Sequence, residues 1–424
     1  MVKNILIIGS GGREHAVCKA FLESDSSLNL FALPGNAGTA LIAKNILHIN
    51  VNNHSEVIDF CQQQNIDLVF IGPEQPLVNG LVDDLQKNNI LVFGPNKNSA
   101  QLEGSKIFMK QIAKQAQVPT AKYKQFTELQ PALQYCLELN FKCVIKADGL
   151  ASGKGVIIVN NEQEAKDAIN SMFAGKFGLA GQKIIVEEFL TGFEVSYFVV
   201  ADGSNFVSLG FVCDHKKVGE NETGLNTGGM GTFSPVQKVS SQLQQQIDTQ
   251  IIAPTLLTLK QQNTQFCGVL FAGLMITDQG PKLLEFNVRF GDPETQVLLP
   301  RLNKQFLPLI LASVYKKLAN FQLILDETKK LVCVVLCAKG YPENHIKGKQ
   351  INGLEKILQT PECYILHAGT ALENQQIIAY GGRVLNVVAT AESFAEARQK
   401  AYNLLQKINW QDGFYRHDIA LKTL

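Results

Sequence analysis

Leu284-Glu285-Phe286-Asn287-Val288-Arg289-Phe290-Gly291-Asp292-Pro293-Glu294 is the stretch that decides the fold of this 424-residue chain. Read as a strand, it sends the apolar even-numbered side chains from 284 to 288 to one face and Glu285, Asn287 and Arg289 to the other. Three polar groups on one strand face are costly to bury without partners. A carboxylate, an amide oxygen and a guanidinium in this pattern suit a hard cation and nearby phosphate oxygens. An amphipathic strand with a solvated face is the simpler alternative.

A second feature upstream is a glycine-rich turn between two expected strands, Cys143–Lys146 and Val156–Val159. The turn contains Ser152-Gly153-Lys154-Gly155, and Lys146 closes the first strand. Glycines let backbone N–H groups approach a phosphate, and lysines neutralise it. A P-loop needs four residues between its first glycine and the Gly-Lys pair and a helix afterwards, so this turn is not one. An ordinary glycine hairpin is the alternative.

The third feature is an apolar strand at 183–190 that runs into Glu187, Glu188 and Phe189. The backbone at such a strand end can hydrogen-bond an adenine edge, and Glu194 could accept hydrogen bonds from ribose hydroxyls. A solvated acidic strand end explains the pattern equally well.

A fourth feature is the basic run Asp214-His215-Lys216-Lys217, which precedes Asn226-Thr227-Gly228-Gly229-Met230-Gly231. The composition of the second segment is typical of a tight anion-binding loop. A plain surface loop is the alternative.

The first hundred residues alternate short apolar strands with helical patterns, which predicts a parallel βαβ sheet with loops at its carboxyl edge. The expected strands are Asn4–Ile8, Leu30–Leu33, Leu68–Ile71 and Leu91–Phe93. Gly9-Ser10-Gly11-Gly12 follows the first strand, but Glu14 takes the third glycine position of a dinucleotide fingerprint. A phosphate at this helix N-terminus remains the expectation, with a pure packing role as the alternative.

The composition limits the possible functions. With 46% hydrophobic and 18% charged residues, the chain is expected to be a soluble globular protein of two or three domains. A net charge of +1 gives no electrostatic case for nucleic-acid or membrane binding. No apolar run reaches membrane-spanning length, and no signal peptide is expected before the first strand. The nine cysteines lack zinc spacing and are expected to be buried thiols in a reducing cytoplasm.

The glycine hairpin, acidic strand end, basic loop and polar strand, in this order, resemble the ATP-grasp superfamily. From Met1 to about Leu421 the chain is similar to the phosphoribosylamine–glycine ligase family, also called glycinamide ribonucleotide synthetases. The segments that carry this similarity lie at 9–15, 34–39, 72–74, 102–106, 146–150, 226–231 and 289–294. The last of them is highly specific to the family. Leu225 stands where the family often has proline, which bears on loop stiffness and little on the chemistry.

The resemblance implies an α/β (α+β overall) ATP-grasp fold in three parts. Residues 1–103 would form an N-terminal parallel βαβ domain on the phosphoribosylamine side. Residues 104–327 would form the ATP-grasp core, with a small lid at about 123–192. Residues 328–424 would form a C-terminal α/β domain that closes one side of the active site.

The resemblance also implies a reaction and its residues. Glycine is joined to 5-phosphoribosylamine through glycyl phosphate, giving glycinamide ribonucleotide, ADP and phosphate in de novo purine biosynthesis. ATP is the co-substrate, and Mg²⁺ or Mn²⁺ would be held by Glu285 and Asn287. Catalytic roles would fall to Lys216, Arg289 and Asp214. ATP would be bound by Lys106, Lys146, Ser152, Gly153, Lys154, Gly155, Glu187, Glu188, Phe189 and Glu194. The other substrates would be bound by Gly9, Gly11, Gly12, Asn36, Gly229, Asp292 and Pro293.

The expected partners are small molecules only, with no nucleic acid and no membrane, and the expected state is a cytoplasmic monomer. Three alternatives remain. The first is another ATP-grasp carboxylate–amine ligase of purine synthesis, or a carboxylase, against which the 289–294 run argues. The second is a non-catalytic nucleotide-binding relative, disfavoured because Glu285, Asn287, Lys146 and Lys216 are all present. The third is a dinucleotide-dependent oxidoreductase, disfavoured by the broken glycine fingerprint.

Overall fold

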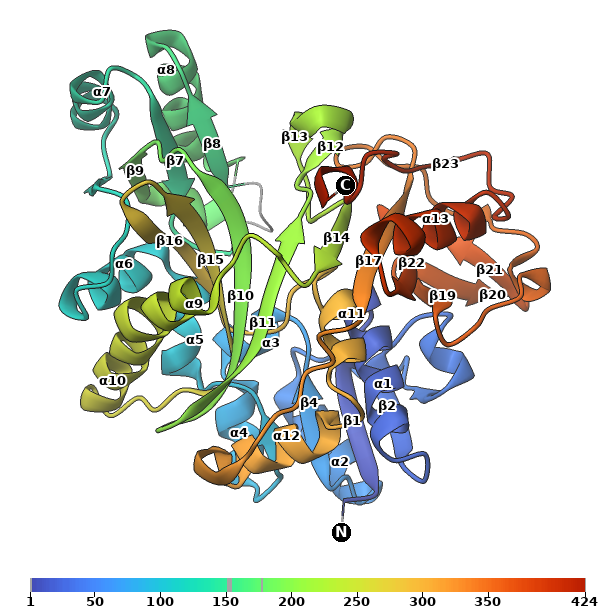
Figure 1. The fold of residues 1–424 in the computed structure, drawn as a ribbon. Helices are drawn as coiled ribbons and strands as arrows, with labels where there is room; N and C mark the ends of the chain where they lie inside the picture. The colour runs from blue at the N-terminus through green and yellow to red at the C-terminus, as the bar shows by residue number, and fades with distance from the viewer. Residues whose placement is uncertain (1, 151–154, 177, 424) are drawn as a thin grey trace.

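The computed structural model describes residues 2–150, 155–176 and 178–423 as a mixed α/β fold (Figure 1). Its N-terminal part is a parallel sheet in the order β3-β2-β1-β4-β5, which confirms the predicted βαβ arrangement. These strands are β1 (Asn4–Gly9), β2 (Asn29–Pro34), β3 (Lys44–Asn45), β4 (Leu68–Ile71) and β5 (Val92–Phe93). The strand order turns back at β1, so the loops after β1 and β4 open the crevice in which such sheets bind ligands.

Helices pack around this sheet, and two of them come from residues 295–314, far from the N-terminal part in the sequence. Helix α1 (Gly12–Ser24) packs against α11 (Thr295–Leu298) and α12 (Phe306–Val314). The ring centroids of Phe21 and Phe306 lie 4.7 Å apart in this contact. The remaining helices of this part are α2 (His54–Gln63), α3 (Glu74–Asn79), α4 (Leu81–Lys87) and α5 (Lys97–Gly104). Helix α6 (Lys106–Gln115) follows α5 and packs against elements of the next part of the chain.

The large sheet in the described residues runs in the order β16-β15-β10-β11-β14-β17-β22-β19, and β23 pairs with β17 at its side. Strand β14 pairs with β17, and this pairing carries the sheet from the middle of the chain into its C-terminal region. Its strands are β10 (Phe193–Asp202), β11 (Phe206–Asp214), β14 (Gly231–Ser234), β15 (Cys267–Thr277), β16 (Gly280–Asn287), β17 (Lys330–Ala338), β19 (Cys363–His367), β22 (Arg383–Ala391) and β23 (Gly413–Phe414). The helices beside it are α9 (Ser241–Ile247), α10 (Ala253–Gln261) and α13 (Phe394–Leu405).

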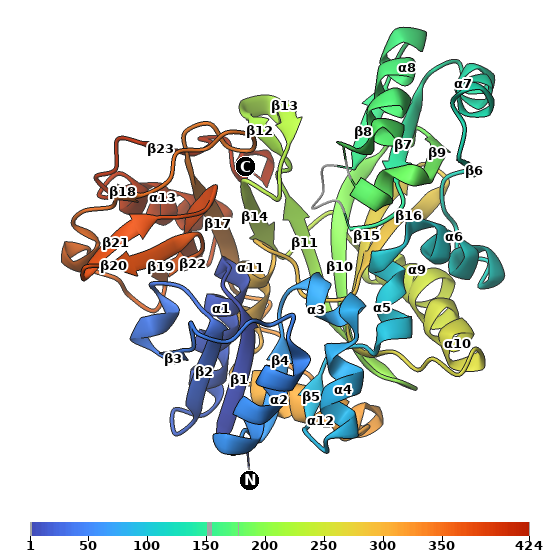
Figure 2. The ribbon, with the colours of Figure 1, turned by 180° about the vertical axis from the view of Figure 1, so that it is seen from behind.

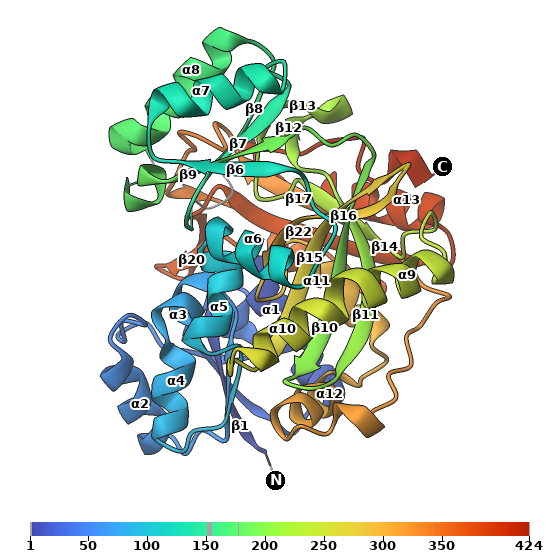
Figure 3. The same cartoon turned by 90° about the vertical axis from the view of Figure 1, so that its left-hand side faces the viewer.

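A small antiparallel sheet in the order β6-β9-β7-β8 stands above α5 and α6 (Figure 3). It has its own apolar core, formed with α7 (Leu129–Glu138) and α8 (Glu162–Ser171). The strands are β6 (Tyr123–Phe126), β7 (Cys143–Ala147), β8 (Val156–Val159) and β9 (Ile184–Glu188). Antiparallel pairing of β7 with β8 confirms the predicted strand–loop–strand around the glycine-rich turn.

A short hairpin separates this small sheet from the C-terminal region (Figure 2). It consists of β12 (Lys217–Gly219) and β13 (Thr223–Asn226). The C-terminal region adds a second small sheet of β18 (Lys349–Gln350), β20 (Thr370–Glu373) and β21 (Gln376–Ala379). None of the helices in the described ranges is long and apolar enough to cross a membrane.

The decisive stretch forms β16, with one departure from the predicted alternation. Leu283 and Glu285 pair with consecutive residues of β15, so Leu284 is the extra residue of a bulge. Leu283 is therefore fully buried in place of Leu284, which is half-buried. The placement of Leu284 on the buried face with Phe286 was wrong, because a period of two does not reveal a bulge. Phe286 and Val288 are buried as expected.

Candidate active site

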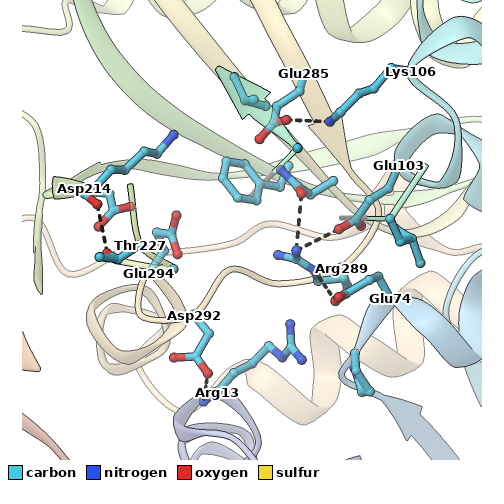
Figure 4. A pocket seen from close by; sticks show the side chains of 18 of the residues that line it. Arg13, Glu74, Glu103, Lys106, Asp214, Thr227, Glu285, Arg289, Asp292 and Glu294 are labelled. Atoms are coloured by element: carbon cyan, nitrogen blue, oxygen red, sulfur yellow. Dashed lines mark hydrogen bonds and ion pairs between the residues drawn. The ribbon is translucent and has the colours of Figure 1, made fainter. Parts of the chain in front are cut away.

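A cavity of about 390 Å³ opens where the small sheet, the large sheet and the N-terminal loops meet (Figure 4). Its walls come from segments that lie far apart in the sequence, and its lining is strongly charged. The lining residues are Arg13, Pro73, Glu74, Glu103, Lys106, Ala147, Gly149, Leu150, Gly155, Val156, Asp214, Lys216, Thr227, Gly228, Phe271, Glu285, Asn287, Arg289, Asp292, Glu294 and Arg383.

Glu285 and Asn287 end β16 side by side on the wall of this cavity. Lys106, the first residue of α6, places its Nζ 2.5 Å from Oε2 of Glu285. Burial alone would raise the pKa of Glu285, but Lys106 and Lys216 hold that pKa below its usual value. The carboxylate is therefore charged across the physiological range and faces the cavity with its negative charge intact.

Arg289 lies two residues past the end of β16 and turns toward two acids of the N-terminal part (Figure 4). Its Nη2 is 2.7 Å from Oε1 of Glu103, and its Nε is 3.3 Å from Oε2 of Glu74. The other oxygen of Glu103 accepts a 2.8 Å hydrogen bond from the backbone N–H of Val288. Burial would lower the pKa of Arg289, but Glu103 and Glu74 raise it. Arg289 is thus a fixed cation that ties β16 to the N-terminal loops.

Lys146 belongs to a buried group of three charges beneath the small sheet. Oε2 of Glu187 lies 2.8 Å from Nζ of Lys146, and Oε1 lies 2.9 Å from Nζ of Lys110. Lys146 also donates a 3.1 Å hydrogen bond to the carbonyl of Leu284, the bulge residue. Burial lowers the pKa of Lys110 to about 8. The Glu187 side chain is thus committed within the protein, and its strand β9 pairs with β6 on one side and β7 on the other.

Asp214 and Glu294 place two carboxylates at the opposite end of the cavity (Figure 4). Burial, and then the charge of Glu294, raises the pKa of Asp214 well above its usual value. Burial likewise raises the pKa of Glu294. Oδ1 of Asp214 has no hydrogen-bond partner among the described residues. Two buried carboxylates with raised pKa values thus lie at this end of the cavity, where a bound cation would favour their ionised forms.

Lys216 lies between the two ends of the cavity and pairs with Glu194. Burial would lower the pKa of Lys216, but Glu194 and Glu285 raise it. The ammonium is therefore fully charged. Since both Lys216 and Glu194 are more than one-third exposed on their side chains, the pair is accessible to a ligand that would compete for either partner.

The first βα loop reaches the cavity through Arg13. The backbone N–H of Arg13 donates to Oδ2 of Asp292 at 3.4 Å. The two positions before Arg13 require glycine. A Cβ at Gly11 would come within 2.7 Å of Asp292, and one at Gly12 would overlap Asn386. Both glycines therefore serve close packing at least, whatever else they contact.

The structure brings many of the predicted site residues to one place. Those that line the cavity are Lys106, Gly155, Asp214, Lys216, Glu285, Asn287, Arg289 and Asp292. Others border its wall through a chain neighbour or a bonded partner, namely Gly12, Lys146, Glu194, Gly229 and Pro293. Gly9, Gly11, Asn36 and Glu187 lie behind the lining, where Asn36 hydrogen-bonds the carbonyls of Ser10 and Gly11 and Glu187 pairs with Lys146. Glu188 accepts a 2.9 Å hydrogen bond from the backbone of Lys122, and the ring of Phe189 lies 5.4 Å from Nζ of Lys142. Ser152, Gly153 and Lys154 lie outside the described residues.

Sequence reasoning missed several charged residues of the site. They are Arg13, Glu74, Glu103, Lys110, Glu294 and Arg383. Glu74 carried a usable signal, because it lies in the loop after a predicted strand, at the ligand-binding edge of a parallel sheet. Lys110 carried a weaker one, since Lys106, Lys110 and Lys114 recur every four residues along one helix.

The donor set at the end of β16 fits a hard divalent cation. Glu285 and Asn287 offer a carboxylate and an amide oxygen, which are the oxygen ligands that Mg²⁺ and Mn²⁺ prefer. The described residues contain no group of three or more His, Cys, Asp or Glu side chains placed to hold a metal. A metal here would therefore be bound by two protein groups and completed by phosphate oxygens and water, as is usual for Mg²⁺ with a nucleotide.

Three family models match consecutive parts of the chain. They are described as the N domain, the ATP-grasp (A) domain and the C domain of phosphoribosylglycinamide synthetase, at residues 3–103, 104–295 and 331–422. A phosphoribosylamine–glycine ligase of Brucella melitensis biotype 1 is 44% identical over 99% of this chain and 98% of its own length.

Solved structures of similar fold include a member of the same family. A crystal structure of phosphoribosylamine–glycine ligase from Thermotoga maritima has a TM-score of 0.86 at 33% identity and covers 98% of this chain and 100% of its own. The biotin carboxylase domain of 2-oxoglutarate carboxylase from Hydrogenobacter thermophilus has a TM-score of 0.73 at 15% identity, over 98% of this chain and 92% of its own. The second likeness concerns the fold alone.

Proposed function

The chain belongs to the phosphoribosylglycinamide synthetase family, and from this membership we propose how its cavity joins glycine to 5-phosphoribosylamine. The enzyme is a carbon–nitrogen ligase of the ATP-grasp fold that acts in purine biosynthesis. One observation carries the proposal for its mechanism. A single cavity holds Glu285 and Asn287 with Lys106 at one end and Asp214 with Glu294 at the other, and Lys216 and Arg289 line it as well.

The reaction proceeds in two steps because a carboxylate carbon is a poor electrophile in water. In the first step an oxygen of the glycine carboxylate attacks the γ-phosphorus of ATP, and the bond to the β-phosphate oxygen breaks to release ADP. In the second step the amine of phosphoribosylamine attacks the carbonyl carbon of glycyl phosphate. The single bond from that carbon to the phosphate oxygen breaks, phosphate leaves with its electron pair, and the amine nitrogen gives up one proton to the released phosphate or to water. Positioning and charge neutralisation supply most of the catalysis in such transfers.

The end of the cavity near β16 binds the triphosphate. Lys106 and Lys146 neutralise phosphate oxygens, and the β7–β8 hairpin with Gly155 covers them. Backbone groups from Glu187 to Phe189 meet the adenine edge, and Glu194 meets the ribose once Lys216 is drawn to the phosphates. Magnesium or manganese, held by Glu285 and Asn287, would neutralise charge on the β- and γ-phosphates.

The opposite end of the cavity binds glycine. The glycine ammonium lies against Asp214 and Glu294, because a cation there would offset the burial that raises the pKa of both acids and the charge of Glu294 that raises the pKa of Asp214 further. Arg289 receives the carboxylate, and Lys216 stabilises charge on the transferring phosphoryl group. A neutral amine attacks glycyl phosphate without a general base, so none is assigned.

Phosphoribosylamine lies against the first βα loop. Its phosphate is attracted by the N-terminus of α1 and by Arg13, beside Gly9, Gly11 and Gly12. Asn36, Gly229, Asp292 and Pro293 shape this side of the site. The small sheet at 123–192 acts as a lid that excludes water, which would otherwise hydrolyse glycyl phosphate. The proposal includes a three-part division at 103 and 327 and a cytoplasmic monomer.

An omission assay tests this function. Purified protein is mixed with ATP, Mg²⁺, glycine and phosphoribosylamine generated in situ, and each component is left out in turn. We expect ADP release only from the complete mixture, together with glycinamide ribonucleotide identified by mass. Release of ADP that does not depend on glycine or on phosphoribosylamine would move the substrates to a related ATP-grasp ligase.

A further inference from the structure

Two side chains of the C-terminal region hold the two loops that form the glycine end of the cavity. Nη1 of Arg383, at the start of β22, donates to the carbonyl oxygens of Gly228 and Asp292, each at 2.5 Å. The hydroxyl of Tyr341 accepts a 3.0 Å hydrogen bond from the backbone N–H of Gly228. Gly228 belongs to the loop 226–231 and Asp292 to the loop 291–294, so Arg383 bonds both loops with a single nitrogen.

The two loops are packed too closely for side chains to intervene. A Cβ at Gly228 would lie 2.9 Å from Cζ of Arg383. A Cβ at Gly229, whose φ is +112°, would lie 2.5 Å from Cδ of Pro293 and 2.8 Å from Oδ1 of Asp214. The 226–231 loop is therefore a layer one backbone thick between Arg383 on one side and Pro293 with Asp214 on the other.

This packing bears directly on the two carboxylates of the site. Asp214 ends β11 and touches the loop through Gly229, and Glu294 directly follows Pro293. Oδ1 of Asp214 has no hydrogen-bond partner among the described residues, so packing against the loop constrains that oxygen. Arg383 remains 21% exposed on its side chain and lines the cavity, where its charge also lies 3.8 Å from Oδ2 of Asp292.

We propose that Arg383 and Tyr341 are positioning residues that set the separation of Asp214 and Glu294 for glycine and the incoming amine. The proposal deepens the proposed function and depends on it. The ATP end of the cavity, built on β16, α6 and the small sheet, has none of these contacts in the described residues. The two residues therefore serve amide formation selectively and leave nucleotide binding unaffected.

The test uses the full-length protein and separates glycine use from ATP binding. Tyr341→Phe removes the hydroxyl that accepts from Gly228 and keeps the ring, and we expect kcat/KM for glycine to fall roughly three- to tenfold. Arg383→Met should lower it by about a hundredfold or more, and Arg383→Lys, which keeps one donor, should recover part of the loss. The Kd for ATP, measured by calorimetry, should stay within about twofold of the wild type in each variant. Tyr380→Phe and Arg398→Lys are matched controls in the same region away from the cavity, and both should behave as wild type.

Each outcome bears on the proposal. Wild-type kcat/KM for glycine in folded Tyr341→Phe and Arg383→Lys would overturn it, and so would a parallel loss of ATP affinity. If Arg383→Met does not fold, Tyr341→Phe and Arg383→Lys still decide. A wild-type protein that makes no glycinamide ribonucleotide would overturn the proposed function and this inference together. Fully active Tyr341→Phe and Arg383→Lys variants would overturn the inference alone.

Discussion

At the scale of single residues, Glu285 is the group whose charge the ATP end of the cavity depends on. Glu285→Gln keeps the size of the side chain but removes the charge that faces Lys106 and Lys216. We expect ADP release to fall by at least about a hundredfold, because a carboxylate ligand to a hard cation is lost. Thermal unfolding checks that the fold is intact. Glu373→Gln, an exposed change on β20, is the control. Near-normal ADP release from folded Glu285→Gln would contradict the metal-binding role.

Lys110 gives a second residue-scale prediction, this time about stability. Its side chain is fully buried, and its ammonium pairs with Glu187 at 2.9 Å. Lys110→Met leaves Glu187 with the direct ion pair to Lys146, and removing one member of a buried ion pair costs roughly 3 kcal/mol. We expect urea unfolding to show a loss of that order. Lys114→Met, at an exposed position of the same helix, should change stability little. Equal effects of the two changes would show that the buried charge is not what matters.

The sequence predicted site residues that follow from a local pattern, and it did not predict those that depend on partners far away in the chain. Glu285 and Asn287 were found because strand alternation places them together. Glu103 and Glu74 were missed, since they contact Arg289 from 186 and 215 positions away. Arg289 was predicted to lie on the strand face, yet β16 ends at Asn287 and the guanidinium turns to those two acids. No local period in the sequence encodes such a partner.

At the scale of elements, two buried histidines join α1 to β19. Nδ1 of His15 accepts a 2.9 Å hydrogen bond from the backbone N–H of His367, which requires that nitrogen to be unprotonated. Burial, and then His367 and Lys19, lowers the pKa of His15 to about 3. Burial lowers the pKa of His367 to about 4. Both histidines are therefore neutral in the folded protein above these values.

This pair makes stability depend on pH in a defined direction. Between about pH 6.5 and pH 4 the unfolded chain binds protons that the folded protein refuses, so the free energy of unfolding falls as the pH falls. The slope is at most about 1.4 kcal/mol per pH unit for each histidine. We expect His367→Gln to flatten the fall between pH 7 and pH 5, whereas His48→Gln, at an exposed position, should not. Equal slopes in the two variants would contradict the assignment.

Elements were predicted more reliably than their irregularities. The four N-terminal strands and the β7–β8 hairpin follow from apolar runs that end at glycine, proline or polar residues. Ser105 and Ser393 cap α6 and α13, and serine at a helix start is a strong local signal. The bulge at Leu284 could not be predicted, because its cause is pairing with β15 and not the sequence of β16 itself.

At the scale of the whole molecule, the continuous large sheet makes the C-terminal region part of the core. Strand β14 pairs with β17 from Gly231–Val334 to Ser234–Leu331, across the expected division at 327. A chain ending at 327 would leave the edge of β14 without the strand that pairs with it, and an unpaired edge is a site of aggregation. We expect this truncated chain to aggregate in size-exclusion chromatography and to recover on co-expression with residues 328–424. A monomeric, cooperatively folding and ATP-binding 1–327 would contradict this account.

The central claim is that glycine is activated by phosphorylation within this cavity, and one isotope measurement tests it most directly. The complete reaction is run with glycine carrying ¹⁸O in both carboxylate oxygens, and the released phosphate is analysed by mass spectrometry. The two-step reaction predicts one ¹⁸O atom in each phosphate and one in each glycinamide ribonucleotide, with ADP release that requires glycine. Phosphate without ¹⁸O, or ADP formed in the absence of glycine, would contradict the account.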